Sequence, residues 1–111
     1  MDYDADIIPL FKKYIGNTLK SLSGRSDITV NNVNNNGFNI TCSDGQVLQE
    51  SHRRTRIVFE KLLSEGVVHV DAALQNSGSR RNIPETLIAN LPFIEHGKVN
   101  NRQHLFLKTH K

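Results

Sequence analysis

Apolar residues recur at spacings of three and four along the first part of the chain. They are Ile7, Ile8, Leu10, Phe11, Tyr14, Ile15, Leu19 and Leu22. This spacing places apolar side chains on one face of an α-helix, which Asp6 could cap and the pair Ser23-Gly24 could end. Gly16 interrupts the run, and glycine inside a helix costs about 1 kcal/mol relative to alanine. The pattern therefore predicts a helix over residues 7–22, with a break or a close packing contact at Gly16.

A segment of alternating polar and apolar residues follows, with the dipeptide Asn-Gly at positions 36–37. This dipeptide is a strong hairpin signal, because both residues tolerate the positive φ of a type I′ turn. A two-residue turn there would place Val33 opposite Ile40, and Val30 would then point to the wrong face of the sheet. We therefore predict a β-hairpin with a bulge near residues 31–32. The many asparagines of the segment are turn formers, a simpler explanation for them than recognition of nucleic-acid bases.

The second half of the chain begins with a helix that has clear end signals. Ser51 can cap it and Gly66 can end it, so we expect it over residues 52–65. Three arginines crowd its first turns: Arg53, Arg54 and Arg56. A cation at a helix N-terminus opposes the helix dipole, typically by about 0.3–1 kcal/mol. Because this placement is unfavourable for the helix, we expect these arginines to serve another purpose.

Shorter elements complete the chain. Residues 67–70 have the pattern of a brief strand, and residues 72–76 that of a short helix. Pro84 fixes the start of a further helix over residues 83–90, since proline fits the first turn of a helix but not its interior. Residues 93–108 alternate around a polar turn, which predicts a two-stranded hairpin with a basic tip.

Composition limits the protein class. A chain of 111 residues with 37% hydrophobic and 23% charged residues is typical of a single folded domain. The single cysteine, Cys42, excludes an internal disulfide framework and a cysteine-rich zinc site. No apolar run approaches the roughly 20 residues of a membrane span, and the N-terminus is acidic, unlike a secretory signal. We therefore expect a cytoplasmic protein that makes no use of a membrane.

Charge is distributed unevenly along the chain. The formal net charge is +3, but residues 1–50 carry a net −2 and residues 51–111 a net +5. Such asymmetry points to a polyanionic partner such as nucleic acid. An exposed basic helix without a function would give the same imbalance, so the position of the cations matters more than their number.

Residues 51–108 contain, in order, a helix, a short strand, a helix, a turn, a helix and a two-stranded hairpin. This order resembles a winged helix-turn-helix DNA-binding domain, with residues 67–70 as the strand that pairs with the wing. The resemblance implies a winged-helix module of three helices and a two-stranded wing over residues 51–108. Together with the N-terminal helix and β-hairpin that the pattern predicts within residues 1–50, this gives an α+β fold. In such domains the helix after the turn enters the major groove, and the wing tip contacts the backbone or the minor groove.

The resemblance also implies a set of residues that contact double-stranded DNA. Arginine can bridge two acceptors on guanine and asparagine can do likewise on adenine, whereas lysines and hydroxyls contact phosphates. The predicted set is Arg53, Arg54, Arg56, Ser79, Arg80, Arg81, Asn82, Thr86, Lys98, Asn100, Asn101 and Arg102. We expect the cations of this set to converge on one positively charged surface.

Catalysis has little support in the sequence. The five histidines have no metal-ligand spacing, and there is no glycine-rich phosphate loop. His69 and His104 could face each other across adjacent strands, as a ribonuclease would require, but surface histidines are the commoner case. We therefore predict a DNA-binding protein that is not an enzyme and uses neither metal nor cofactor. Transcription regulation, a restriction-modification or other restriction-type system, a mobile element and a phage accessory role all fit.

Two alternatives concern partners. Winged-helix surfaces also bind proteins, so an adaptor or inhibitor of another protein is the main alternative to a DNA-binding module. The N-terminal helix either completes the core or forms a homodimer through Ile8, Phe11 and Ile15. Membership of a larger protein complex fits the same sequence.

Overall fold

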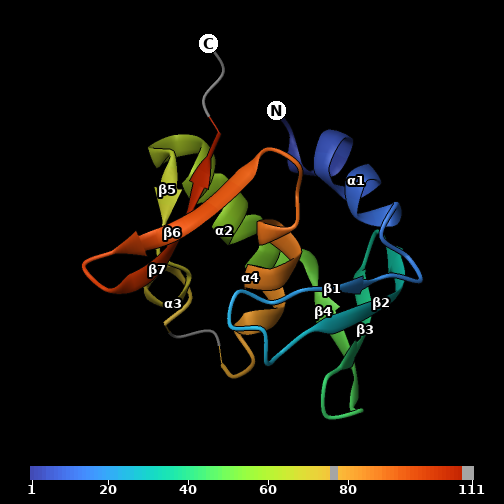
Figure 1. The fold of residues 1–111 in the computed structure, drawn as a ribbon. Helices are drawn as coiled ribbons and strands as arrows, with labels where there is room; N and C mark the ends of the chain where they lie inside the picture. Colours follow the sequence, from blue (N-terminus) through green and yellow to red (C-terminus); the bar gives the residue numbers. More distant parts are fainter. Residues whose placement is uncertain (76–77, 109–111) are drawn as a thin grey trace.

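Two antiparallel sheets lie on either side of helices α2 (His52–Glu65) and α4 (Asn82–Ala89) (Figure 1). The computed structural model describes residues 1–75 and 78–108. The N-terminal half forms a four-stranded sheet in the order β1-β2-β3-β4, and the C-terminal half forms a three-stranded sheet in the order β5-β7-β6. The predicted α+β class is confirmed. Among the helices of the described residues, none combines the length and the apolar composition needed to cross a bilayer.

The N-terminal helix is much shorter than predicted. A π-helical turn (η1, Tyr3–Ile7) leads into α1 (Ile8–Lys12), and the chain then turns into β1 (Thr18–Leu19). Gly16 adopts a φ of 88°, a left-handed conformation that glycine accepts without steric cost, and its N–H donates to the carbonyl of Val30. The predicted helix over residues 7–22 is therefore wrong beyond Lys12, and the weak point at Gly16 is where the chain joins the sheet.

The asparagine-rich segment forms the predicted hairpin, but with its turn one residue earlier. β2 (Ile28–Asn34) and β3 (Gly37–Cys42) are joined by a two-residue turn at 35–36. Val33 consequently pairs with Phe38 rather than Ile40. The side-chain oxygen of Asn34 accepts the N–H groups of Asn36 and Gly37, and these bonds stabilise the earlier turn. The bulge predicted near residues 31–32 is confirmed, since the register shifts between Val30 and Asn32.

A fourth strand, β4 (Val47–Ser51), was not predicted. It pairs with β3 and brings its backbone against Gly37. A Cβ atom at Gly37 would lie 2.2 Å from the carbonyl oxygen of Glu50, so only glycine fits at this position. The sheet therefore depends on a close approach between two segments that the local pattern does not reveal.

Helix α2 has the predicted ends, with the Ser51 side chain at its N-cap and Gly66 in left-handed conformation after it. The later elements follow the predicted order: β5 (Val67–Val68), α3 (Val70–Ala73), α4 (Asn82–Ala89), β6 (Ile94–Val99) and β7 (Arg102–Leu107). α3 begins and ends earlier than predicted, and residue 76 of the predicted helix lies outside the described residues. α4 includes Asn82, which was expected to be its cap. β5 pairs with β7, as expected for residues 67–70.

One hydrophobic core joins the two halves of the chain. Phe11 of α1, Phe38 of β3 and Phe59 of α2 are all almost completely buried in it. Ile8 is also buried, so two of the three residues expected to form a dimer face instead complete the core, and only Ile15 remains exposed. The homodimer predicted through this face is therefore not available, whereas the alternative of core completion is confirmed.

Candidate nucleic-acid interface

The tip of the β6–β7 hairpin carries four of the predicted DNA-contact residues, all of them exposed: Lys98, Asn100, Asn101 and Arg102. Asn100 and Asn101 have φ values of 52° and 65°, so they form a two-residue turn in which both residues are left-handed. Within residues 1–75 and 78–108, neither Lys98 nor Arg102 forms an ion pair. The tip therefore presents two unpaired cations and two amide side chains.

Arg54 has a structural role in the fold. Its guanidinium makes two parallel hydrogen bonds of 2.8 Å to the carboxylate of Glu50, and only 8% of the residue is exposed. It also donates to the carbonyl oxygens of Ser79 and Arg80, at 2.7 and 3.3 Å. Arg54 thus fixes the backbone immediately before α4. This burial and these partners do not favour the contact with DNA that was predicted for Arg54, which stays a prediction.

Arg56 faces the N-terminus of the chain. Its two terminal nitrogens donate to the carboxylate of Asp4 at 2.9 and 3.0 Å, and its guanidinium carbon lies 4.6 Å from the centre of the Tyr3 ring. The hydrogen bonds from Arg56 lower the pKa of Asp4. Arg56 therefore ties η1 to α2, on a different part of the surface from the hairpin tip (Figure 1).

The two arginines before α4 each have a carboxylate partner. Arg80, with a positive φ of 56°, donates to Asp44 and to Gln46 in the β3–β4 turn, both at 3.2 Å. Arg81 donates to the carbonyl of Leu74 and lies 3.6 Å from the carboxylate of Asp71. Both arginines remain partly exposed, but each points to a different acidic neighbour, so their charges are partly neutralised.

The remaining predicted residues divide between the surface and the interior. Arg53 and Ser79 are exposed, and Asn82 is partly buried at the start of α4. Thr86 is completely buried, which does not favour the contact with DNA predicted for it. It lies three residues after Ile83 and therefore shares the buried face of α4, a spacing that the sequence already contained.

A groove of about 380 Å³ lies between α3, α4 and β7. Arg102 and Gln103 line it from β7, whereas Asp71 and Glu85 line it from the two helices, together with His69. Burial raises the pKa of Glu85, and the nearby charge of Asp71 raises it further. The groove therefore combines Arg102 of the hairpin with two acidic groups.

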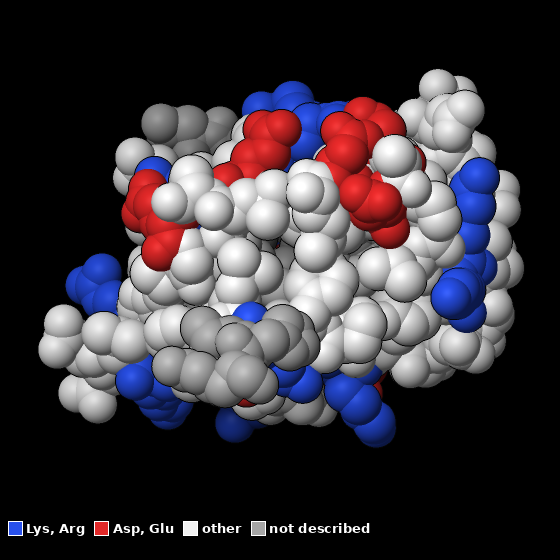
Figure 2. Space-filling model, turned by 90° about the horizontal axis from the view of Figure 1, so that it is seen from above, with Lys and Arg blue, Asp and Glu red and all other residues white. Residues whose placement is uncertain are grey.

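Charges on the molecular surface are segregated. Figure 2 shows Asp and Glu side chains mainly along the upper edge of that view, and Lys and Arg side chains mainly along its lower and right-hand edges. The contacts above include one mixed pair near the N-terminus, Arg56 with Asp4. The cations of the predicted set do not form one continuous cluster. In the described part of the chain, those without an ion pair are Arg53 and the two cations of the hairpin tip, Lys98 and Arg102.

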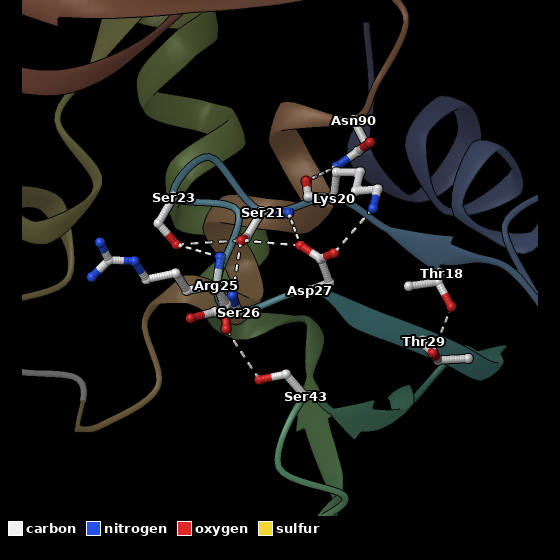
Figure 3. Close-up of polar contacts among 10 residues, drawn as sticks. All are labelled: Thr18, Lys20, Ser21, Ser23, Arg25, Ser26, Asp27, Thr29, Ser43 and Asn90. Atoms are coloured by element: carbon white, nitrogen blue, oxygen red, sulfur yellow. Dashed lines mark hydrogen bonds and ion pairs between the residues drawn. The ribbon is translucent and has the colours of Figure 1, made fainter.

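A polar loop that the sequence did not single out connects the N-terminal sheet to the end of α4 (Figure 3). The carboxylate of Asp27 accepts the N–H and hydroxyl of Ser21 at 2.9 and 3.2 Å and lies 3.5 Å from Lys20. The side-chain amide of Asn90 donates to the carbonyl of Lys20 at 3.0 Å. The loop thus contacts the C-terminal end of α4 through Asn90.

No family model, curated protein or solved structure matches this chain. The function therefore has to follow from the residues themselves. They form a cationic hairpin tip, a groove beside it that contains both acidic and basic side chains, and, around the start of α4, arginines that are each bound to a carboxylate.

Proposed function

We propose that the chain binds double-stranded DNA without catalysing a reaction, and that residues 51–108 dock on DNA as a winged helix-turn-helix unit. The chain order α2, β5, α3, α4, β6, β7 supports this proposal, as does the strand order β5-β7-β6. In this assignment α4 is the helix that follows the turn, and the β6–β7 hairpin is the wing. The N-terminal half then serves to complete the core.

The observation that carries the proposal is the free cationic tip of the hairpin. Lys98 and Arg102 are exposed beside the turn, and neither forms an ion pair within the part of the chain that the structure describes. Free cations neutralise DNA phosphates and release counterions, and this release supplies most of the non-specific affinity for DNA. Asn100 and Asn101 can add hydrogen bonds to phosphates or to base edges.

A second candidate function is the binding of another protein. The observation that favours it is the mixed charge around α4, where Arg80 faces Asp44, and Arg81 faces Asp71 near Glu85. Protein–DNA interfaces are strongly positive, so acidic groups at this position are better suited to a protein partner. The cations of the hairpin tip favour a DNA partner, whereas the mixed charges at the start of α4 favour a protein partner. Mutations at the two places therefore test the two functions separately.

The test is a fluorescence-anisotropy titration of a random-sequence DNA duplex at low and physiological salt. We compare Lys98→Ala/Arg102→Ala with Lys12→Ala/Lys13→Ala, a control that removes the same charge from exposed lysines at the end of α1, far from the hairpin (Figure 1). The hairpin variant should lower affinity at least tenfold and reduce the salt slope by about 2, whereas the control should change both much less.

One result would contradict DNA binding, and a second would contradict the hairpin tip as its interface. The first is absence of binding by the unmodified protein at about 50 mM salt, where phosphate contacts are strong. The second is an equal loss in the two double variants, which would indicate attraction by net charge alone. A specific partner that co-purifies through high salt and nuclease treatment would favour the protein-binding function.

A further inference from the structure

A cavity of about 330 Å³ opens between the end of α2, β5, α3 and β7. Two valines of β5 and two alanines of α3 give it an apolar wall: Val67, Val68, Ala72 and Ala73. A pocket with an apolar wall and a few polar groups is the usual form of a site for a small, mostly planar ligand. None of the contacts in the proposed interface with duplex DNA uses this cavity.

Two stacked imidazole rings form another part of the cavity wall. The ring centres of His69 and His104 lie 5.1 Å apart with an angle of 25° between the planes, and both residues line the cavity. The ring of Phe106 continues the row at 6.4 Å and 29° from His104. Nδ1 of His104 donates to the carbonyl of Arg102 at 2.8 Å, which orients the ring. A fixed row of nearly parallel rings is suited to stacking of a planar aromatic group.

The cavity is adjacent to the proposed DNA surface. His69 lines both this cavity and the groove of about 380 Å³, and Arg102 of the hairpin tip lines that groove. On the other side, Lys61 lines the cavity with its ammonium group 2.7 Å from the carboxylate of Glu65. A ligand that extends from Arg102 past His69 would therefore meet a cation beside Asp71 and Glu85, then an aromatic wall and an apolar recess.

We propose that this cavity receives one unpaired nucleotide of a DNA strand held at the hairpin tip, with its base against His69 and His104 and its phosphate near Arg102. This proposal rests on the DNA-binding function above and names the part of the DNA that the site recognises. A base inside a duplex is stacked on both faces and cannot enter, so the ligand is a single-stranded end or a base lifted out of the helix. A free mononucleotide has the same chemistry, and the experiment separates the two sources.

The test uses three ligands: a blunt duplex, the same duplex with a short single-stranded extension, and the free mononucleotide deoxyadenosine monophosphate. Ala72→Leu fills the cavity from an exposed position on α3, and Ala5→Leu is the matched control at an exposed alanine of η1. His69→Ala removes one ring of the stack, whereas His69→Phe keeps a ring there. Thermal unfolding of each variant verifies that it folds.

The unmodified protein should bind the extended duplex about 5- to 100-fold more tightly than the blunt one, the range that stacking of one base supplies. Ala72→Leu should lose this gain and keep its affinity for the blunt duplex, and His69→Ala should lose the gain. Ala5→Leu and His69→Phe should retain it. Equal affinity of the unmodified protein for both duplexes, or a gain that survives Ala72→Leu, overturns the proposal.

The mononucleotide distinguishes failure of this proposal from failure of the proposed function. If the protein binds no DNA, the DNA-binding function fails, and NMR shifts caused by the mononucleotide decide whether the cavity takes a nucleotide. Shifts at His69 and His104 that Ala72→Leu abolishes would support the nucleotide chemistry of the cavity, and absence of shifts would overturn it. Mononucleotide binding without any effect of the extension would assign the cavity to free nucleotides and overturn recognition of a strand.

Discussion

Tyr3 and His52 form a buried hydrogen bond that fastens the N-terminus of the chain to the start of α2. The hydroxyl of Tyr3 lies 2.8 Å from Nδ1 of His52, and Nε2 of the same ring lies 2.7 Å from the carbonyl of Asn34. Because a carbonyl only accepts, Nε2 carries the proton and Nδ1 accepts from Tyr3. Burial raises the pKa of Tyr3, so its hydroxyl remains a donor over the ordinary pH range. One histidine therefore joins the N-terminal turn, the hairpin and α2.

Tyr3→Phe should lower the free energy of unfolding by about 1–3 kcal/mol, because it leaves Nδ1 of His52 buried without its donor. Urea denaturation measures the change. In a His52→Leu background the same substitution should cost much less, since the partner is already gone, and this double-mutant cycle isolates the hydrogen bond. An equal loss in both backgrounds would show that Tyr3 acts only by packing.

Arg54→Ala should lower the free energy of unfolding by about 3–5 kcal/mol, because it leaves Glu50 buried without a counter-charge and frees the backbone before α4. Arg53→Ala, at the exposed neighbouring arginine, should change it by less than about 0.5 kcal/mol. Guanidinium denaturation of both variants makes the comparison. Similar values for the two would remove the structural role assigned to Arg54.

Local signals in the sequence predicted those elements whose ends depend on one or two residues. Ser51 and Gly66 were enough to bound α2, because a cap and a left-handed stop are local features. The helix predicted over residues 7–22 is wrong beyond Lys12. The apolar spacing continues past Gly16, but the backbone N–H of Gly16 bonds to Val30 of the sheet instead of continuing a helix. The hairpin turn lies one residue earlier than predicted because the side-chain oxygen of Asn34 accepts the N–H groups of Asn36 and Gly37. Pairing with a strand distant in sequence carries no periodic signature.

Of the candidate site, only the exposed hairpin tip was predictable from the sequence. The hairpin tip was identified correctly as exposed and basic, because a polar turn between two strands is a local feature of the sequence. The ion pairs of Arg56 and Arg80 were not predictable, since their carboxylate partners lie far away along the chain: Asp4 is 52 residues from Arg56, and Asp44 is 36 residues from Arg80. The composition gives the number of cations, whereas the fold determines which of them form ion pairs with acidic side chains.

Thr86→Val should raise the free energy of unfolding by about 0.5–2 kcal/mol and leave DNA affinity unchanged. The Thr86 hydroxyl is buried and, in the part of the chain described, has no hydrogen-bond partner, so its burial is unfavourable. Valine has nearly the same shape and lacks the hydroxyl. Thermal unfolding and anisotropy titration are the two measurements, and a loss of DNA affinity at unchanged stability would restore Thr86 to the interface.

Glu85→Gln should stabilise the protein at neutral pH but not in acid. Burial, and then the Asp71 charge, raise the pKa of Glu85 in the folded state, so the fold binds its proton more tightly than the unfolded chain does. Stability therefore falls as pH rises through the raised pKa, and the substitution removes this loss. Melting temperatures should favour the variant at pH 7 and converge below about pH 4.5, the ordinary glutamate value. Glu95→Gln, at an exposed glutamate of β6, should show no such convergence.

Asp44→Asn should increase affinity for DNA if Arg80 contributes to the interface. The carboxylate of Asp44 lies 3.2 Å from the guanidinium of Arg80. It also accepts the N–H of Gln46, and this hydrogen bond is the main cause of the lowered pKa of Asp44. The side-chain oxygen of an asparagine can accept the same N–H. The turn should therefore survive while the guanidinium loses its counter-charge, and duplex affinity at low salt should rise about threefold to tenfold. Glu60→Gln removes one exposed negative charge from α2 and serves as the matched control. Equal gains in both variants would attribute the effect to net charge, and no gain in Asp44→Asn would exclude Arg80 from DNA contact.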